Sequence, residues 1–519
     1  MDGSPDNSAE DWGPFGRPLF DDPSARALSR VGVVDVGSNS VRLVVFDGAA
    51  RSPAYFYNEK IMCALGAELG KTGYLNPEGK VRALAAIKRF QLLAEGMGLA
   101  PLTAVATAAV REAKDGPAFR EEIERETGLR LYVIDGEEEA RLSAQGVMLG
   151  WPEAEGLVCD IGGSSMELAE VRNGQVGRRV SSPLGPLKLQ NIKGGQKAIR
   201  KHIAAQIAEL TQIMGTDFRR LYLVGGSWRA IARLDMERRN YPLLVLHEYR
   251  MDKRAVSATG KWIKKSDPDD LRSRTGTSAA RMSLVPLASE ILRQLTRSFK
   301  PREIAVSSYG IREGMLYEQM PAQLRRRDPL IEACRFAESK DARIPGAGRS
   351  LNTFLAPLFK SAKPAHRRMI HAACLLHDVT WRAHPDYRAE VCFDNATRAN
   401  LGGLAHSERV WLGIALLHRY KNNQKGSRYQ PLFELLEKKE QHLAEVVGKA
   451  MRFGAMFAVE KPDRLAQLKW EPKKKILTLK LQHKAVDLFG EVASARFESL
   501  ALALDAAPVV KVMRKPKAD

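Results

Sequence analysis

A short pattern that occurs twice in the chain constrains the fold more than any other feature. In each copy an apolar run ends in an acid, a turn of small polar residues follows, and a second apolar run leaves the turn. The copies are VVDVGSNSVRLVV, which contains Asp35, and VCDIGGSSMELAEV, which contains Asp160. Runs rich in β-branched residues, joined by such a turn, predict a strand hairpin. Its recurrence indicates two related halves.

The two turns have the composition of an anion site. Glycine and the small residues after it let backbone N–H groups converge on one point, as they do where proteins bind phosphate. The residues concerned are Gly37, Ser38, Asn39 and Ser40 in the first turn, and Gly162, Gly163, Ser164 and Ser165 in the second. An acid beside each turn suggests a metal ion that accompanies the phosphate. On these residues alone, a purely structural hairpin explains each turn equally well.

The pattern of the first 320 residues indicates an α/β fold. Asn76-Pro77 predicts a helix start, and strand-like runs at Leu102–Ala106 and Leu131–Ile134 alternate with helical stretches. A later strand, Leu221–Val224, runs into a third glycine-rich turn. That turn consists of Gly225, Gly226 and Ser227. Two α/β halves that face each other would bring all three turns to one cleft, where a phosphorylated ligand could bind.

The charge favours a polyanionic partner. The 519 residues contain 81 Lys and Arg against 61 Asp and Glu, a formal net charge of +20. Residues 331–519 hold 33 of these basic residues and 20 of the acidic ones. Such a basic surface attracts nucleic acid or polyphosphate. Five cysteines without a CxxC pair, and no run long enough to span a membrane, indicate a reducing, cytoplasmic compartment and no membrane partner.

Six motifs follow one another across residues 31–317, namely VDVGSNSVRL, TAAVREA, GEEEAR, CDIGGSSMEL, LVGGS and GIREGML. In this order they resemble the exopolyphosphatase and guanosine pentaphosphate phosphohydrolase (Ppx/GppA) family. The resemblance implies an α/β fold with two halves around a cleft. Each half would have the ribonuclease H-like fold found in actin, Hsp70 and sugar kinases. A mostly α-helical HD-like domain and a small basic C-terminal α+β region would follow.

The expected boundaries come from this resemblance and from the local composition. They are 1–29 for a disordered tail, 30–142 and 143–324 for the two halves, 325–455 for the HD-like domain and 456–519 for the basic region. His377-Asp378 matches the HD pair. An active HD site also needs an earlier histidine, and the chain has none where it would be wanted, so we expect a hydrogen-bonded core histidine here.

The resemblance also implies roles for single residues. Glu139 matches the catalytic base, although acids at a helix start, such as Asp135 and Glu138, also act as caps. Arg111 matches an arginine that neutralises the transferred phosphoryl group. Candidate ligands for Mg²⁺ or another divalent ion are Asp160, Glu167 and Asp35. A monovalent cation such as K⁺ is a further candidate cofactor. Gly225, Gly226 and Ser227 correspond to the loop that binds adenosine in ATP-using relatives, and Arg312 with Glu313 suggests a structural ion pair.

Three positions depart from the family pattern. Ser164 replaces a glycine and Met166 a threonine in the second turn, and Asp115 replaces an asparagine after the TAAVREA motif. Ser164 narrows the space in which a phosphate can approach the backbone, so it could slow turnover. Asp115 would place a negative charge near a phosphate channel.

The resulting prediction is an exopolyphosphatase that releases terminal orthophosphate from inorganic polyphosphate with water activated by Glu139. One alternative keeps the site and changes the substrate to guanosine pentaphosphate, with guanosine tetraphosphate as a related ligand. The others are a kinase of the same superfold and a non-catalytic protein that binds polyphosphate or an alarmone. Family members are commonly dimers, so we also expect a homodimer.

Overall fold

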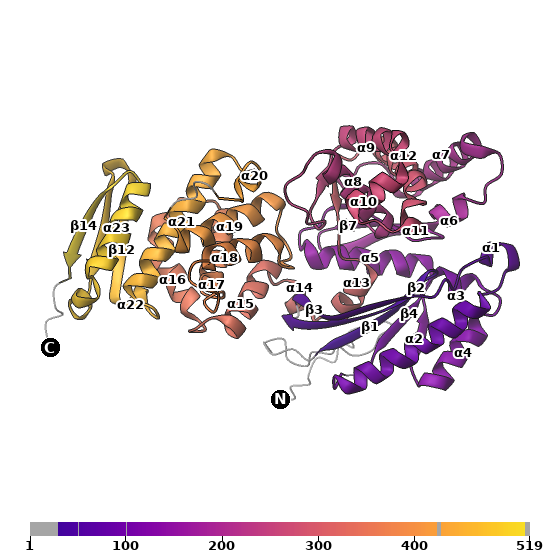
Figure 1. Cartoon of the computed structure of the whole chain (residues 1–519), viewed down its shortest axis with the longest axis horizontal. Helices are drawn as coiled ribbons and strands as arrows, with labels where there is room; N and C mark the ends of the chain where they lie inside the picture. The colour runs from indigo at the N-terminus through magenta and orange to yellow at the C-terminus, as the bar shows by residue number, and fades with distance from the viewer. Residues whose placement is uncertain (1–29, 50, 100, 423–426, 514–519) are drawn as a thin grey trace, which may run out of the picture. The chain divides into compact units, whose positions relative to one another are not determined.

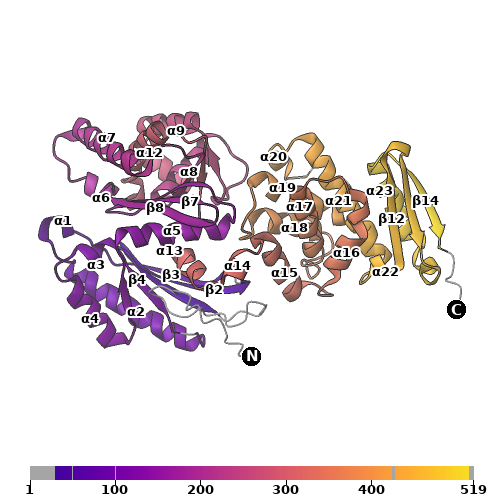
Figure 2. The same cartoon turned by 180° about the vertical axis from the view of Figure 1, so that it is seen from behind.

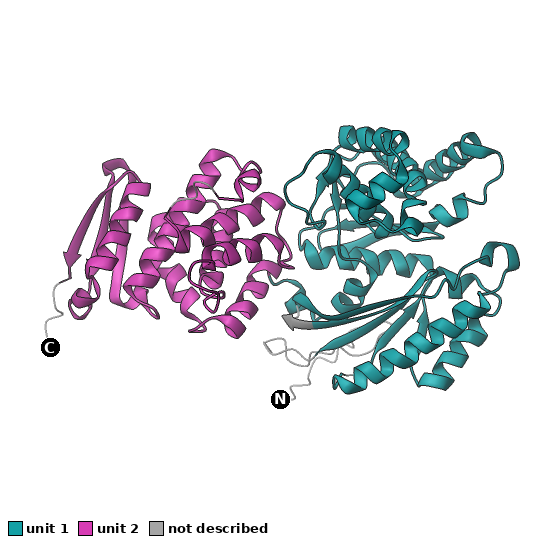
Figure 3. Ribbon diagram, viewed as in Figure 1, with its two compact units in different colours: residues 1–327 teal, residues 328–519 magenta. Residues whose placement is uncertain are grey.

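The computed structural model describes residues 30–49, 51–99, 101–422 and 427–513. The chain divides after Arg327 into two compact units, which Figure 3 shows in separate colours. The tail expected over residues 1–29 lies outside the described residues. In the described part of the chain, no helix has the length and hydropathy needed to span a membrane.

The first half of unit 1 is a five-stranded sheet with the strand order β3-β2-β1-β4-β5. β1 and β2 form the predicted hairpin, β3 extends it, and β4 and β5 lie parallel to β1. The strands are β1 Val31–Val36, β2 Ser40–Ala49, β3 Ser52–Met62, β4 Thr103–Ala106 and β5 Leu131–Val133, and the helices are α1 Leu69–Thr72, α2 Pro77–Gly96, α3 Ala108–Glu112 and α4 Gly116–Thr127. α2 begins as predicted, because the Asn76 side chain accepts a hydrogen bond from the Gly79 N–H (2.7 Å).

The second half repeats this topology. Its sheet has the order β10-β11-β9-β6-β7-β8, in which β6 and β7 form the second predicted hairpin and β9 and β11 add in parallel. The strands are β6 Gly156–Ile161, β7 Met166–Arg172, β8 Gln175–Ser182, β9 Arg220–Val224, β10 Arg250–Met251 and β11 Glu303–Val306. The helices are α5 Gly136–Gly150, α6 Pro186–Leu189, α7 Gly195–Met214, α8 Gly226–Arg238, α9 Lys253–Lys265, α10 Pro268–Thr275, α11 Ala279–Met282, α12 Val285–Phe299, α13 Ile311–Glu318 and α14 Ala322–Arg325. The expected duplication is confirmed.

Helices α5 and α13 lie between the two sheets, as Figures 1 and 2 show from opposite sides. Alternate strand residues face this middle layer, because side chains alternate across a strand. In β1, Val31 and Val33 pack in the middle layer, whereas Val34 and Val36 pack in the outer core that contains α2 residues. The same alternation directs the β1 carboxylate, Asp35, toward the middle layer.

The contact between α5 and α13 depends on two glycines. A Cβ at Gly146 would overlap the carbonyl oxygen of Gly310, and one at Gly314 would overlap that of Leu142. A backbone group cannot move aside as a flexible side chain can. The small residues therefore set the close approach of the two helices in the middle layer.

We expect Gly314→Ala to lower the free energy of unfolding by about 1–3 kcal/mol, the usual cost of overpacking a core. Denaturant unfolding followed by circular dichroism measures this change. Gly96→Ala is the matched control, because that helical glycine has open space around its Cβ position and alanine there should stabilise the helix by about 0.5–1 kcal/mol. Equal stability of the two variants would contradict the role of the helix crossing.

Unit 2 is helical, with a three-stranded sheet of order β12-β13-β14 near its end. Its helices are α15 Pro329–Asp341, α16 Ala347–Leu355, η2 Ala356–Phe359, α17 Pro364–Leu376, α18 Arg388–Arg398, α19 His406–Tyr420, α20 Gln430–Phe433, α21 Lys438–Phe457, α22 Pro462–Leu465, η3 Pro472–Lys474, η4 His483–Leu488 and α23 Glu491–Ala503, and its strands are β12 Ala466–Glu471, β13 Ile476–Leu481 and β14 Ala507–Val512. α18 and α19 pack side by side in its centre.

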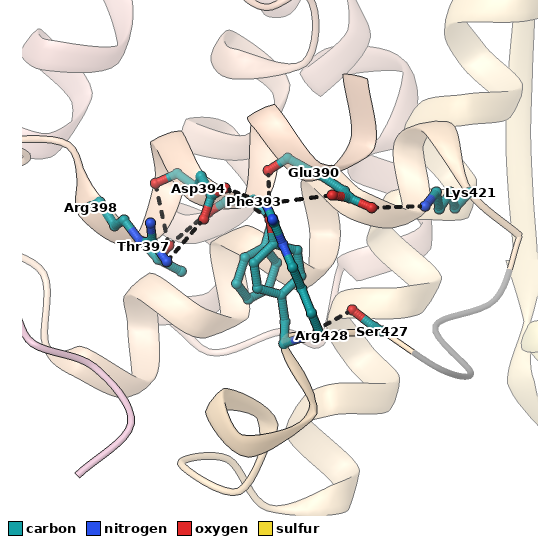
Figure 4. A network of polar contacts seen from close by, with 9 residues as sticks. Glu390, Phe393, Asp394, Thr397, Arg398, Lys421, Ser427 and Arg428 are labelled. Atoms are coloured by element: carbon teal, nitrogen blue, oxygen red, sulfur yellow. Dashed lines mark hydrogen bonds and ion pairs between the residues drawn. The ribbon is translucent and has the colours of Figure 1, made fainter. Parts of the chain in front are cut away.

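Basic residues of unit 2 are partly neutralised by local ion pairs. Figure 4 shows one such network, in which α18 supplies the acids. Arg428 Nη2 lies 3.0 Å from Asp394 Oδ2, and Lys421 Nζ lies 3.5 Å from Glu390 Oε1. At this part of the surface, the positive charges are therefore already paired with acids.

The side chains of His377 and Asp378 form hydrogen bonds with other residues of unit 2. His377 is buried, and its Nδ1 hydrogen-bonds with the Cys374 carbonyl (2.7 Å), as expected for a core histidine. Asp378 Oδ2 accepts a hydrogen bond from Arg343 Nε (2.8 Å). Burial, with a smaller contribution from Arg419, lowers the pKa of His377 to about 4.

Candidate functional site

A cavity of about 540 Å³ in unit 1 collects the three glycine-rich turns. It lies where β1, β6 and β9 end and their turns begin, and it is lined by residues from both halves. All the turn residues predicted from the sequence line it, together with three of the predicted acids, namely Asp35, Glu139 and Asp160. Arg111 and Glu167 are not among the lining residues. Arg111 forms an ion pair with Glu139, and Glu167 lies opposite Asp160 on the neighbouring strand.

The first two turns have the same closure. The Gly37 N–H donates to the Ser40 carbonyl, and the Gly162 N–H donates to the Ser165 carbonyl, each over 3.0 Å. The second turn is braced from outside, because Leu187 N–H donates to the Gly163 carbonyl (2.9 Å). Turns of this kind hold several small polar groups around one point, which suits a phosphoryl group.

The two departures in the second turn have different surroundings. Met166 is fully buried in the outer core of the second half, so it lies away from the cavity. Ser164 lines the cavity. Its backbone packs directly against Gly185, where a Cβ would overlap it, so this glycine allows the close approach of the two segments.

Asp35 forms an ion pair across the two halves. Its Oδ2 lies 2.9 Å from Arg312 Nη1, which belongs to α13. The sequence suggested that Arg312 pairs with Glu313, and this partner was wrong. Glu313 instead accepts hydrogen bonds from the Gly310 N–H (2.7 Å) and the Tyr55 hydroxyl (2.8 Å). Asp35 therefore lines the cavity as a carboxylate whose charge is paired with Arg312.

Asp160 and Glu167 lie directly opposite each other on β6 and β7. Both face the middle layer, because they alternate with outward-facing core residues such as Cys159 and Leu168. Ser143 of α5 donates a hydrogen bond to Asp160 Oδ2. Glu167 is only 1% exposed, and although the Ser181 hydroxyl donates to its Oε1 (3.0 Å), its Oε2 has no hydrogen-bond partner.

Glu139 stands on α5, one helical turn before Ser143. Asp135 caps this helix as predicted, by accepting a hydrogen bond from the Glu138 N–H (2.8 Å). Glu139 is 6% exposed and lines the cavity. Arg111 Nη1 lies 3.3 Å from Glu139 Oε2 and donates to the Ile134 carbonyl (2.7 Å). The Ile134 carbonyl thus fixes the position of Arg111, and Arg111 in turn orients Glu139.

Burial and neighbouring carboxylates raise the proton affinity of the three acids Glu139, Asp160 and Glu167. Burial raises the pKa of Glu139 well above its ordinary value, Glu167 and Asp160 raise it further, and Arg111 opposes this shift. Burial likewise raises the pKa of Asp160 and brings that of Glu167 to about 8. A buried cluster of this kind is stabilised by protons, by a cation, or by both.

The carboxylates of Asp160 and Glu167 suit a divalent ion, although the described residues alone do not supply a complete set of ligands. Among the described residues, no group of three or more His, Cys, Asp or Glu is placed to hold a metal by itself. Glu167 nevertheless has a buried oxygen without a partner beside Asp160 and Glu139. Mg²⁺ typically takes one or two protein carboxylates and completes its shell with water and substrate phosphates. Asp160 and Glu167 suit that pattern.

Several cavity residues were missed by sequence reasoning. Lys60, Arg229 and Arg281 line the cavity from β3, α8 and α11, and no local pattern marks them. Asp115, expected near a phosphate channel, is not among the cavity residues. Instead it pairs with Lys80 (2.9 Å) and accepts a hydrogen bond from the Leu75 N–H (2.9 Å), so its role is structural.

A duplicated α/β fold with two phosphate-type turns and a buried carboxylate in one cleft defines a phosphoryl-transferring or phosphate-releasing enzyme. The Ppx/GppA phosphatase family model matches residues 44–323, more than half of the chain, and the model of the exopolyphosphatase C-terminal region matches residues 348–506. The chain therefore belongs to the Ppx/GppA phosphatase family. It is a hydrolase that acts on phosphoanhydride bonds.

Known relatives span much of the chain. Exopolyphosphatase 1 of Mycobacterium tuberculosis (strain ATCC 25618 / H37Rv) is 25% identical over 312 residues, which cover 57% of this chain and 89% of the relative. Retrograde regulation protein 2 of Saccharomyces cerevisiae is 25% identical over 478 residues, which cover 82% of this chain and 77% of the relative. Two solved structures share the fold, each with 23% identity, a TM-score of 0.51 and coverage of 56% of this chain and 97% of the other. They are the Aquifex aeolicus Ppx/GppA family member and an exopolyphosphatase from Cytophaga hutchinsonii.

Proposed function

We propose that the chain is an exopolyphosphatase, which releases terminal orthophosphate from inorganic polyphosphate. The observation that carries this proposal is the buried Glu139, held by Arg111 beside two phosphate-type turns. The match to the exopolyphosphatase C-terminal region and the relative of that name support the polymer as substrate. The net positive charge of residues 331–519 supports it too, because a long polyanion needs a basic surface.

The reaction uses few protein groups. The turns at Gly37 and Gly162 hold the non-bridging oxygens of the terminal phosphoryl group through backbone N–H groups and hydroxyls. Glu139 accepts a hydrogen bond from a water and takes its proton as the water oxygen attacks the terminal phosphorus in line. The bond from that phosphorus to its bridging oxygen breaks, and this oxygen stays on the shortened chain. Arg111 keeps Glu139 oriented and its charge partly balanced.

Phosphatases of this family generally depend on a divalent metal. In this chain Asp160 and Glu167 would hold the ion, which would supply positive charge to the oxygens of the breaking bond. Ser143 and Ser181 keep the two carboxylates in place through the hydrogen bonds described above.

The direct test measures orthophosphate release from long-chain polyphosphate and from guanosine pentaphosphate, side by side, with Mg²⁺ and with EDTA. We expect metal-dependent release from the polymer at the higher kcat/KM. Release from the nucleotide alone would move the substrate to alarmones and overturn the proposal. Tight binding of polyphosphate without any release would assign a binding role instead.

Arg111→Met should lower kcat/KM about 10²-fold, because Arg111 orients Glu139 and a positioned general base contributes about 10²–10⁴-fold. Because Arg111 lowers the pKa of Glu139, its loss should also move the acid limb of the pH–rate profile to higher pH. The measurement is kcat/KM from pH 5 to pH 9. Arg111→Lys is the control, since it keeps the charge and should retain most of the wild-type pH profile. If the acid limb lies at the same pH in Arg111→Met as in the wild type, Arg111 does not set the pKa of the catalytic base.

A further inference from the structure

Three arginines of unit 2 lie together on neighbouring helices that contribute nothing to the cavity described above. Arg419 stands near the end of α19, Arg452 on α21 and Arg496 on α23. Helix α21 packs against both α19 and α23 (Figure 1). The positive charges of Arg496 and Arg419 both act on Arg452, so the three guanidinium groups are near one another. We call Arg419, Arg452 and Arg496 the arginine cluster.

The arginine cluster contains buried N–H groups without an acceptor. Arg419 is only 5% exposed. Its Nε, like Arg452 Nη1 and Arg496 Nε, is buried and has no hydrogen-bond partner among the described residues. Elsewhere in unit 2 the fold supplies acceptors to a buried guanidinium, since Arg409 Nη2 donates to the Leu401 carbonyl (2.7 Å). Buried donors are nearly always paired in folded proteins, so the cluster requires an acceptor that the described part of the chain does not provide.

The nearby acids do not neutralise the arginine cluster. Asp378, whose charge acts on Arg419, already accepts a hydrogen bond from Arg343 Nε (2.8 Å). On α21, Glu445 pairs with Lys449 over 2.8 Å. In the described ranges, no acid forms an ion pair with an arginine of the cluster. The surface network on α18 is different, because there the basic side chains have acidic partners.

The charge of the cluster favours an anion over water. Burial, with the charges of Arg496 and Arg419, lowers the pKa of Arg452 to about 10, so this side chain is still positive at neutral pH. Burial also lowers the pKa of Arg419. Water can accept hydrogen bonds from the N–H groups, but it leaves like charges repelling one another in a poorly solvated place. An anion satisfies the donors and balances the charge together.

The geometry of arginine indicates the class of anion. A guanidinium offers a planar fork of N–H donors that matches the oxygens of a phosphoryl group through charge-assisted hydrogen bonds. Forks from three helices suit a tetrahedral group, whose oxygens point in several directions. Arg419 is almost closed off from solvent, whereas Arg452 and Arg496 are half-buried. The ligand is therefore a small ion or the end of a larger molecule.

We propose that Arg419, Arg452 and Arg496 form a phosphate-binding site, made entirely of unit 2 residues, which holds one phosphoryl group. The group belongs either to free orthophosphate or to the end of a longer phosphorylated molecule. The site goes beyond the proposed function and does not depend on it, because phosphate can bind here whatever the substrate of unit 1. Its role is recognition of phosphate rather than hydrolysis.

Hydrogen–deuterium exchange of the full-length protein, resolved by peptide, tests this site. Sodium phosphate is titrated against sodium chloride at constant ionic strength, and tripolyphosphate is titrated in parallel with EDTA present. A ligand slows exchange in the segments that it stabilises. Peptides from α19, α21 and α23 report the arginine cluster, whereas peptides from the two phosphate-type turns report the cavity of unit 1. Binding in the cavity is thus measured separately.

In the wild type, phosphate should slow exchange in α19, α21 and α23 in a saturable way. Arg419→Gln and Arg452→Gln should each raise the Kd measured on these peptides at least about 10-fold, because charge-assisted hydrogen bonds are lost. Arg496→Gln, at a half-buried position, should do the same and serves if either of the others fails to fold. The control is Arg367→Gln, which removes an exposed charge from α17 and should leave the Kd within about twofold.

Thermal melting in chloride gives a second reading of the same variants. Each substitution in the cluster removes one of several buried charges that repel one another, so the variants should melt at or above the wild-type temperature. In phosphate the order should reverse, because the ligand stabilises only a protein that binds it. A merely structural role for the arginines predicts lower melting temperatures in both salts, and that result would contradict the site.

Comparison of the two ligands identifies the source of the phosphoryl group. Tighter binding of orthophosphate than of tripolyphosphate assigns the site to the free ion, and the reverse order assigns it to the end of a longer molecule. No protection of α19, α21 and α23 by either ligand, or equal protection in the wild type and the cluster variants, would overturn the site. Failure of the proposed function is a separate result, because it concerns phosphate release, which this experiment does not use.

Discussion

Glu139→Gln is expected to lower kcat for phosphate release from polyphosphate about 10³-fold, within the range that a general base contributes. Glutamine keeps the size of the side chain and an oxygen that can accept the hydrogen bond from Arg111. It has almost no proton affinity, so the attacking water loses its base. KM should change less than about threefold, because the phosphate-type turns are untouched. Initial rates of orthophosphate release at saturating substrate measure the effect.

The neighbouring glutamates provide the control for this prediction. Glu137 is an exposed residue on the same first turn of α5, so Glu137→Gln should leave kcat within about twofold of the wild type. If Glu139→Gln keeps more than about a tenth of the wild-type kcat, another group activates the water. If both variants lose activity equally, the effect belongs to the start of the helix rather than to a base.

The architecture of unit 1 could be predicted because its signals are local. Each hairpin is specified by two apolar runs, and the alternation along β1 and β6 decides which residues face the middle layer. Asp35 and Asp160 follow from that alternation, since each stands one residue before the last residue of its strand, on the face that points to the middle layer. The predicted turns, both hairpins and the cap of α5 were therefore correct.

The choice among three consecutive glutamates could not be made from spacing. Glu138 pairs with Arg141, Glu137 is exposed, and only Glu139 is buried in the cavity beside Arg111. That difference depends on how α5 packs against the sheets, which is a tertiary property. The resemblance to the family supplied the choice before the packing was known.

Contacts between the halves were also beyond sequence reasoning. Arg312 pairs with Asp35, which precedes it by more than half of the chain, and Glu313 lies next in sequence yet binds elsewhere. Lys60, Arg229 and Arg281 converge from three separate elements. No periodicity along the chain links such residues, so only the packed structure brings them together.

Glu167→Gln should stabilise the folded protein at alkaline pH when no divalent ion is present. Burial raises the pKa of Glu167 from its ordinary value of 4.5 to about 8, so between these values the folded state binds a proton that the unfolded state has released. Stability therefore falls as the pH rises through this window. Glutamine resembles the protonated acid and removes this loss, so the gain should be small at pH 5 and on the order of a few kcal/mol at pH 9.

Added Mg²⁺ should reverse the comparison, because an ion that binds only the folded state stabilises it by mass action, by about 2.7 kcal/mol at a concentration of 100 Kd. The wild type should gain this stability at pH 8, whereas Glu167→Gln should gain much less and should release phosphate slowly. Denaturant unfolding with Mg²⁺ or EDTA measures both effects without relying on activity. Glu170→Gln is the control, since that acid pairs with Arg178 (2.9 Å) on the next strand and its pKa is lowered, so its loss should neither stabilise the protein at pH 9 nor alter the gain from Mg²⁺. An equal gain from Mg²⁺ in the wild type and in Glu167→Gln would show that the ion is held by other residues, and Asp160→Asn would then be the variant that abolishes it.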